Sequence, residues 1–345
     1  MERLKDSQKL NARCQLRKEV KAVSTFETDT FAGTITSPGF RRRLRWGVLL
    51  PTFSHNWQKP PPIVTAARWA EELGFDAVWA ADHLLSPAPV LDSLTCLAAA
   101  AAVTDTVDLG VSVLQLALRP LAWTAKQLAT LDAMAPGRLR LGVGLAGEYV
   151  EEFIAAGVPR SARKHITDEM LLVLPQLLRG EPVEHHSQNF TATVPKGLKP
   201  SLSRIPPISV GGRRQPSLLR TVRFGDQWLP MWLDAETIRS SAQELADLCL
   251  KHGRDSVPSI GLLAVTYVDD DERLAHEVAS AFSSSQFKLS FDAIEQWTMY
   301  GPAAKVAGMI GEYRDAGVSE LILMPASDTL DQYERLAEVL KLVEC

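Results

Sequence analysis

From Trp46 to the C-terminus, short apolar runs alternate with longer segments of helical spacing, and this alternation constrains the fold more than any other feature. Between the runs, apolar residues recur at every third and fourth position, as in segments 63–73, 123–134, 164–178, 235–251 and 303–316. Repeated βα units of this kind favour one closed (β/α)8 barrel, with a doubly wound α/β fold as the alternative. The eight predicted strands are 46–50, 77–80, 107–114, 139–144, 208–210, 227–230, 260–267 and 320–324.

Two stretches interrupt the repeat. Segment 181–207 contains the alternating run 183–190, which predicts a short hairpin before the fifth strand. Segment 283–301 carries Phe287, Phe291, Trp297 and Tyr300 between the seventh and eighth units. Long loops in a compact domain are usually binding loops or lids, so we expect both stretches to be able to cover a substrate.

The first 40 residues differ from the rest. They are polar, mixed in charge and without a sustained period, and Ser37-Pro38-Gly39 closes them with residues typical of turns. We predict that residues 1–40 form an N-terminal extension whose composition is compatible with disorder, and that residues 41–345 form the barrel.

Composition excludes several classes of protein. Hydrophobic residues make up 46% of the chain and charged residues 23%, a balance that favours a globular fold over a disordered one. The net charge is −4 and the only basic block is 41–43, so we expect no nucleic-acid partner. The longest apolar run, 94–103, is too short to cross a bilayer, and the chain begins with charged residues. These features predict a cytoplasmic protein without a membrane partner.

The spacing of the cysteines indicates neither a disulfide framework nor a metal site. Cys14, Cys96, Cys249 and Cys345 are scattered singly, and no histidine lies near them at the spacing of metal ligands. We therefore expect neither disulfides nor a metal site.

Titratable, aromatic and glycine residues gather directly after the predicted strands. In a barrel of parallel strands the active site forms at the carboxyl ends of the strands, so these segments should share one end of the molecule. A barrel with a purely structural role would not need such residues there. The segments are 51–55, 82–83, 112–115, 144–148, 211–213 and 231–232.

His83 is the sharpest catalytic candidate. Imidazole can exchange a proton near neutral pH, and a carboxylate such as Asp82 or Glu148 could assist that exchange. We expect His83, Asp82 and Glu148 to be the catalytic residues. The alternatives are a histidine that only packs in the core and, for Glu148, a solvated acid in the first turn of a helix.

Gly211, Gly212 and Arg213 precede a helix that begins near Pro216. Glycines let backbone N–H groups approach an anion, the helix N-terminus adds positive potential, and an arginine adds a charge-assisted contact. This combination predicts a phosphate site, and the alternative is a simple turn.

Several of these segments resemble the luciferase-like oxidoreductase family, some of whose members use the deazaflavin coenzyme F420 and others FMN. The resemblance extends from Trp46 to the C-terminus and departs from the family pattern at 135–137, where Ser-Gly-Gly is common, and at Gln227, where glycine is frequent. The N-terminal extension has no counterpart. The motifs lie in the family's order at 74–83 (GFDAVWAADH), at 131–132 with 137–144, and at 208–212 with 225–228.

The resemblance assigns roles to the candidate residues. It implies that His83 donates or accepts a proton beside the reactive ring of the cofactor, and that Gly144 and Glu148 contact the cofactor or take part in acid–base chemistry. It also implies that 211–213 hold the cofactor phosphate.

In several members of the family a non-proline cis peptide in the third strand forms a bulge behind the ring. Carried over to this sequence, that bond joins Ser112 and Val113, which become cofactor-binding residues. A non-proline cis bond persists only where its surroundings enforce it, which a cofactor-facing role would explain.

The resemblance thus implies hydride transfer between F420 and a small organic substrate, in a protein that could be a homodimer. With reduced FMN and oxygen, the reaction would instead be monooxygenation. A third hypothesis places the chain in a different functional class, that of a non-catalytic barrel that binds a ligand, because a fold does not establish a function. A buried His83 remote from any pocket would favour that reading.

Overall fold

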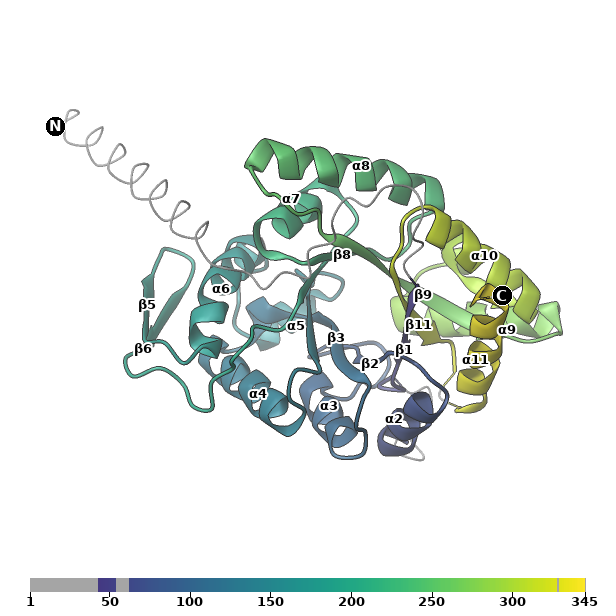
Figure 1. The fold of residues 1–345 in the computed structure, drawn as a ribbon, viewed down its shortest axis with the longest axis horizontal. Helices are drawn as coiled ribbons and strands as arrows, with labels where there is room; N and C mark the ends of the chain where they lie inside the picture. Colours follow the sequence, from purple (N-terminus) through teal and green to yellow (C-terminus); the bar gives the residue numbers. More distant parts are fainter. Residues whose placement is uncertain (1–42, 54–61, 328, 345) are drawn as a thin grey trace. The chain divides into compact units, whose positions relative to one another are not determined.

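A computed structural model describes residues 43–53, 62–327 and 329–344, and its central feature is a closed parallel barrel (Figure 1). Each strand pairs with its neighbours in parallel, and the last barrel strand pairs with the first. All eight predicted strands are present with ends within one residue of the prediction, so the (β/α)8 architecture is confirmed. In barrel order they are β1 Arg45–Leu49, β2 Ala77–Ala80, β3 Asp108–Leu114, β4 Leu139–Val143, β7 Ile208–Gly211, β8 Gln227–Leu229, β9 Ser259–Val268 and β11 Glu320–Pro325.

Helices surround the strands, as the helical spacing predicted. Several begin at an aspartate whose side chain accepts a hydrogen bond from the first turn, as Asp92, Asp234 and Asp271 do. The surrounding helices are α2 Ile63–Glu72, α3 Ser93–Ala101, α4 Leu121–Met134, α6 Arg163–Leu178, α7 Gln215–Phe224, α8 Ala235–His252, α10 Ala303–Asp315 and α11 Asp331–Glu344.

The two irregular stretches fold differently from one another. The predicted hairpin is present as the antiparallel pair β5 (Val183–His186) and β6 (Thr191–Val194). Segment 283–301, predicted as one long loop, is instead the end of α9 (Glu272–Phe287), two short 3-10 turns and β10 (Met299–Gly301), which pairs with β9. The helix continues through three serines because Ala275, Ala279 and Phe282 keep a buried face at helical spacing.

The barrel interior is packed solid below the mouth. Trp79 of β2 is fully buried, and a Cβ on Gly47 or Gly110 would lie 2.5 or 2.2 Å from its indole ring. Glycine at these two positions therefore makes room for the tryptophan. Near the amino ends of the strands, Gln227 donates a hydrogen bond to Glu320 at 2.9 Å. The Gln227 oxygen also accepts a hydrogen bond from the Ser209 hydroxyl at 2.8 Å, so both ends of this buried amide have partners.

Some predictions fall outside the described ranges. The N-terminal extension up to residue 40, Cys14 and Cys345 lie there, so the domain boundary stays a prediction. Within the described ranges, no helix combines the length and apolar character needed to span a membrane.

Candidate active site

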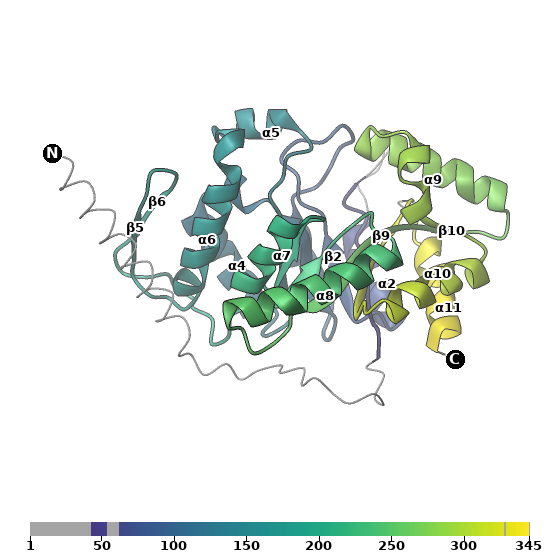
Figure 2. The same cartoon turned by 90° about the horizontal axis from the view of Figure 1, so that it is seen from above.

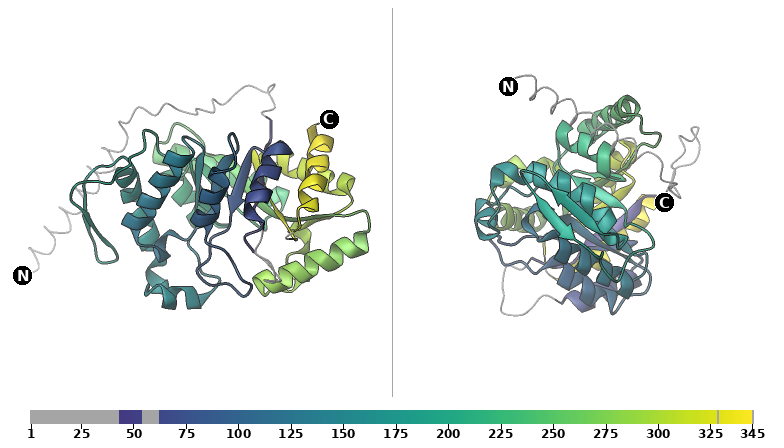
Figure 3. Two further views of the ribbon diagram at one scale, coloured as in Figure 1. Left: turned by 90° about the horizontal axis from the view of Figure 1, so that it is seen from below. Right: turned by 90° about the vertical axis from the view of Figure 1, so that its left-hand side faces the viewer.

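Two helices flank the carboxyl ends of the strands, at the barrel mouth. They are α5 (Val150–Ala155) and α9, which Figure 2 and Figure 3 show at the same end of the barrel. The two helices are joined directly, because the hydroxyl of Tyr149, the residue before α5, donates a hydrogen bond to the backbone carbonyl of Gln286 in α9 at 2.7 Å. Side chains from both segments therefore border the region where the sequence placed the active site.

Asp82 is engaged in structural contacts. Its carboxylate is 3% exposed and forms an ion pair with the guanidinium of Arg119, whose Nε lies 3.2 Å away. It also accepts hydrogen bonds from the Ser93 hydroxyl at 2.8 Å and from the backbone N–H of Gln115 at 2.9 Å. The expectation that Asp82 partners His83 is therefore not met, because these three groups already occupy its oxygens.

His83 has two other partners. Its Nδ1 lies 3.2 Å from Oε1 of Glu152 and 2.9 Å from the amide nitrogen of Gln115. A carboxylate can only accept, so a proton on Nδ1 satisfies Glu152, and rotation of the Gln115 amide would turn its otherwise unpartnered oxygen toward the same proton. With the amide in that orientation the proton lies on Nδ1, and Nε2, which has no hydrogen-bond partner among the described residues, is the nitrogen that can accept a proton.

Glu152 is the buried anchor of this site. Its carboxylate is 0% exposed, and Oε1 also accepts hydrogen bonds from the backbone N–H groups of Leu84 at 2.8 Å and Leu85 at 3.3 Å. The same oxygen thus fixes the loop after β2 and the imidazole. Its second oxygen, Oε2, has no hydrogen-bond partner among the described residues.

Aromatic rings enclose His83. The rings of Tyr149 and Phe53 lie 5.4 and 6.1 Å from the imidazole, measured between centroids. Burial, and then the nearby charge of Glu148, raise the pKa of the Tyr149 hydroxyl. Glu148 itself is exposed, so the structure places it beside Tyr149 rather than against His83. Its catalytic role stays a prediction.

The predicted irregularity in β3 is present. The peptide bond between Ser112 and Val113 is cis, and the pairing of β3 with β4 shifts register between Val111 and Leu114. The Val113 side chain lies across the ends of the neighbouring strands. A Cβ on Gly144 would come within 2.3 Å of it, and a Cβ on Gly211 within 3.2 Å. Val113 therefore excludes a side chain at position 144 unless it moves, and crowds position 211, a reason for these glycines that the sequence analysis did not give.

The segment 211–213 leads into α7 as predicted. Gly212 has a φ of +138°, and a Cβ there would lie 2.6 Å from Cβ of Ser217. The residue that caps α7, Arg214, makes no side-chain hydrogen bond to the helix, but Pro216 has no N–H and the N–H of Ser217 donates to the Arg214 carbonyl at 2.7 Å. In the first turn only the N–H of Gln215 is left for an anion, so a phosphate here would depend mainly on the Gly211–Gly212 backbone and the arginine side chains. The guanidinium of Arg213 lies 5.2 Å from the ring centroid of Trp232, which follows β8 in a left-handed conformation with φ of 57°.

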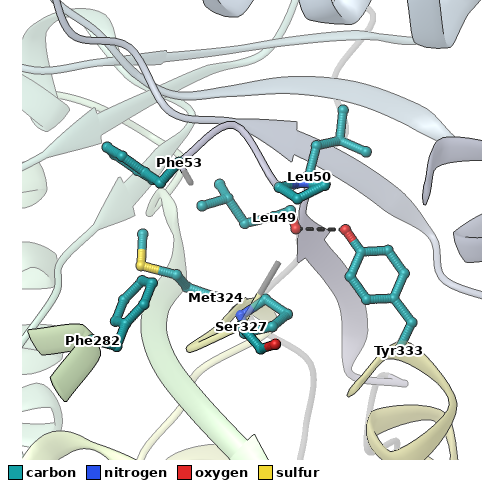
Figure 4. Close-up of a pocket in the computed structure, with 9 residues that line it drawn as sticks. Leu49, Leu50, Phe53, Phe282, Met324, Ser327 and Tyr333 are labelled. Atoms are coloured by element: carbon teal, nitrogen blue, oxygen red, sulfur yellow. Dashed lines mark hydrogen bonds between the residues drawn. The ribbon is translucent and has the colours of Figure 1, made fainter. Parts of the chain in front are cut away.

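An apolar cavity lies between the ends of β1 and β11 and helix α9. Figure 4 shows Phe53, Met324 and Phe282 grouped on one side of it, while Tyr333 on the other side donates a hydrogen bond to the carbonyl of Leu49 at 2.8 Å. Its volume is about 10 Å³, which is room for one water molecule. The cavity marks the apolar side of the mouth.

Unsatisfied polar atoms test whether a cofactor fits here. Buried donors and acceptors normally have partners, and those that lack one in a protein often face a ligand or water. In the described part of the chain, atoms of this kind occur at several places, including Arg45, Arg140 and Glu320 at the amino ends of the strands. One group lies in or after the carboxyl ends of five strands and belongs to Thr52, Ser112, Gln115, Glu152, Trp232, Ser283 and Gln286. With Gly211, Gly212 and the adjacent Arg213, this group fits a polar, ring-bearing cofactor with a phosphate.

Sequence reasoning missed part of this arrangement. Glu152 and Tyr149 were not singled out, and Gln115 was noted only as the end of a strand. Glu152 lies in an ordinary acidic pair, Glu151-Glu152, and no spacing in the sequence indicates that its side chain turns inward under the loop after β2. The one available signal was its place in the first turn after the glycine-rich segment.

Comparisons with known proteins agree with this architecture. A sequence model of the family described as luciferase-like monooxygenase matches residues 44–340. An F420-dependent glucose-6-phosphate dehydrogenase of Beutenbergia cavernae is 46% identical over 101 residues, which are 27% of this chain and 29% of that protein. The chain spans about half the length (48%) of other curated relatives that it matches.

Two solved structures show the same fold. An F420-dependent secondary alcohol dehydrogenase in complex with an F420–acetone adduct superposes with a TM-score of 0.76 at 21% identity, covering 87% of this chain and 99% of that chain. The oxygenating component of the 3,6-diketocamphane monooxygenase of Pseudomonas putida, in complex with FMN, has a TM-score of 0.70 at 15% identity and covers 87% and 96%. At these identities the likeness is one of fold.

Proposed function

The chain belongs to the luciferase-like monooxygenase family, and on that premise we propose that it is an oxidoreductase that transfers a hydride between coenzyme F420 and a small organic substrate. The observation that carries the proposal is the state of His83. Its Nδ1 lies 3.2 Å from the carboxylate of the buried Glu152, and with the proton on Nδ1, Nε2 would serve as a proton acceptor at the barrel mouth.

The mouth has residues suited to hold the cofactor. The backbone at Gly211 and Gly212 and the side chain of Arg213 would bind its phosphate, and Val113 would support its ring. When bound, the deazaflavin would supply the hydride chemistry, which is a property of the cofactor rather than of the protein. The chain's own residues would orient the substrate, exclude water and hold the proton that accompanies hydride transfer at Nε2 of His83.

Titration of the purified protein with F420 and with FMN, each oxidised and reduced, is the first test. We expect F420 to bind more tightly. Tight binding of FMN without binding of F420 would favour monooxygenation, the function suggested by the fold likeness to the camphane enzyme. Binding of neither would favour a non-catalytic barrel.

Variants of the same protein separate binding from chemistry. Arg213→Ala should weaken F420 binding about tenfold, the loss of one charge-assisted contact. Arg223→Ala is the matched control, because Arg223 lies 4.7 Å over the ring of Phe224 at the opposite end of α7. His83→Asn should keep F420 binding but lower the single-turnover rate by about a hundredfold. A His83→Asn variant with a normal rate would refute the proposed role.

Assembly as a homodimer and a cytoplasmic location are part of the same proposal. The first rests on the family resemblance alone, and light scattering after size-exclusion chromatography measures it.

A further inference from the structure

Two arginine side chains lie beside the glycine-rich segment after β4 and take no part in the proposed cofactor site. Arg160, in a short 3-10 turn (Arg160–Ala162), donates a hydrogen bond from Nη2 to the carbonyl of Gly147 at 2.8 Å. Arg163, the first residue of α6, donates from Nη1 to the carbonyl of Arg160 at 2.8 Å. A Cβ on Gly147 would lie 3.5 Å from Nε of Arg163 and 3.9 Å from Nη2 of Arg160. Both guanidinium groups therefore lie against the same residue.

The positive charge of this pair is not compensated within the described part of the chain. The partners of both guanidinium groups there are backbone carbonyls, and neither group forms an ion pair with a carboxylate. Nε of Arg163 is buried and has no hydrogen-bond partner among the described residues. Two like charges within 4 Å of one point repel each other, so an anion that pairs with their free N–H groups would be favoured.

The first turn of α6 adds to this positive potential. Arg163 is followed by Lys164, and the turn contains no acidic residue. Asp168, one turn after Lys164, pairs instead with the buried Arg220. Positive side chains at the amino end of a helix oppose its dipole, whereas an anion bound there is favoured by the dipole and by the side chains.

Two carboxylates border the same segment. Glu148 and Glu151 are exposed, and neither forms an ion pair with Arg160 or Arg163. Because water and salt screen exposed charges, these carboxylates reduce the attraction of the two guanidinium groups for an anion without cancelling it.

The arginine pair lies next to the proposed cofactor site. β4 and β7 are neighbouring strands, so Gly147 and the segment 211–213 follow adjacent strands of the barrel. In the other direction the chain runs into Tyr149, whose ring lies 5.4 Å from the imidazole of His83. Figure 2 shows the start of α6 beside α5 at this end of the barrel. An elongated ligand in the mouth would therefore reach the two arginines with its outer end.

We propose that Arg160 and Arg163 form a second anion site at the rim of the mouth, which binds a carboxylate at the outer end of the ligand held there. Guanidinium and carboxylate groups pair through parallel N–H···O hydrogen bonds, which suits arginine to this role. Two molecules would bring such a group, namely F420 with its acidic tail beyond the phosphate, and a substrate that carries a carboxylate. The inference rests on the proposed function, because it extends the cofactor and the substrate placed at the mouth.

Titration of F420 into arginine variants tests the first source. Arg160→Gln and Arg163→Gln should each weaken F420 binding about tenfold, the loss of one charge-assisted contact. When either is combined with Arg213→Ala, the two losses should multiply, because independent sites contribute additively to the free energy of binding. A double variant that binds F420 no more weakly than Arg213→Ala alone would mean that these arginines hold one phosphate, and would overturn the proposal.

Calorimetric titration of glutarate, a simple dicarboxylate, into the F420-loaded protein tests the second source. If the carboxylate belongs to the substrate, the native chain should bind glutarate and Arg163→Gln should weaken that binding about tenfold. An effect on either ligand supports the site and identifies the source of its carboxylate. If both ligands bind the arginine variants as they bind the native chain, the proposal is overturned. If the native chain binds no F420, the proposed function fails, and glutarate titrated into the unloaded chain decides this inference alone.

Arg179→Gln is the matched control. Arg179 caps the opposite end of α6 and pairs with Glu181 at 2.6 Å, so its replacement removes the same charge from the same helix and should leave the binding of both ligands unchanged. Melting temperatures separate binding from a structural role. Because Arg163 opposes the helix dipole, Arg163→Gln should keep or raise the melting temperature. A lower melting temperature with unchanged binding of both ligands would show that Arg163 only supports the fold.

Discussion

The clearest test of how the site is built is Asp82→Asn. In the structure this carboxylate is almost fully buried and pairs with Arg119, whose side chain is 20% exposed. Breaking a buried ion pair by removing one partner costs about 3–5 kcal/mol when the other charge is left uncompensated. Here Arg119 keeps a second carboxylate, that of Asp92 at 2.9 Å, which lowers the cost. Asparagine keeps an oxygen that can still accept from Ser93 or Gln115, so we expect a loss near the lower end, about 3 kcal/mol.

The assay is a thermal melt beside a single-turnover measurement. At about 2 °C per kcal/mol for a domain of this size, the melting temperature should fall by about 6 °C. The matched control is Glu277→Gln, which removes the partner of Arg273 in an exposed pair and should change stability by less than about 1 kcal/mol.

The turnover of folded Asp82→Asn decides between structure and catalysis. If Asp82 only fixes Arg119 and the start of the segment after β3, the rate per folded molecule should change much less than the roughly hundredfold loss expected for His83→Asn. An unchanged melting temperature together with a hundredfold slower turnover would refute this reasoning. It would restore Asp82 as the catalytic acid.

Two further predictions concern the walls of the mouth. Glu152→Gln replaces a charge-assisted contact to His83 by a neutral one, a difference of about 1 kcal/mol, so the ratio of the Nδ1–H to the Nε2–H tautomer should fall about fivefold. Long-range nitrogen NMR of the imidazole measures this ratio, and an unchanged ratio in a folded variant would contradict the prediction. Gly144→Ala should destabilise the protein because its Cβ meets the Val113 side chain, and Val113→Ala should rescue it. Chemical denaturation measures both free energies of unfolding. Gly142→Ala is the control that Val113→Ala should not rescue, since its Cβ would lie 2.2 Å from the backbone oxygen of Val111, which a smaller side chain at 113 does not move.

The strands could be predicted because each is a separate local pattern. A buried parallel strand reads as a short apolar run, and the helix that covers it reads as apolar residues at helical spacing. The same dependence on local patterns explains why the prediction of one long loop at 283–301 was wrong. Three consecutive serines and scattered aromatics carry no strong period, and the buried face of α9 is formed largely by alanine and polar residues.

The candidate site was predicted by position but not by partner. His83 and the segment 211–213 lie at the barrel mouth because every strand delivers its following residues there. The contact of His83 with Glu152 joins residues 69 apart, and that of Asp82 with Arg119 joins residues 37 apart. Such pairs depend on how two loops pack against each other, which a single sequence does not encode in any local pattern.

The contact of Val113 with its glycine neighbours couples the residue types that are allowed at positions 113, 144 and 211. One side chain from β3 occupies the space that a Cβ would need on Gly144, directly after β4, and crowds the Cβ position of Gly211, at the end of β7. A side chain larger than valine at position 113 would crowd the backbone at both glycines. An alanine at position 144 has room only if residue 113 is smaller than valine. Natural variation at these positions should therefore be correlated, and mutational libraries that aim to reshape the mouth would have to vary them jointly rather than one at a time.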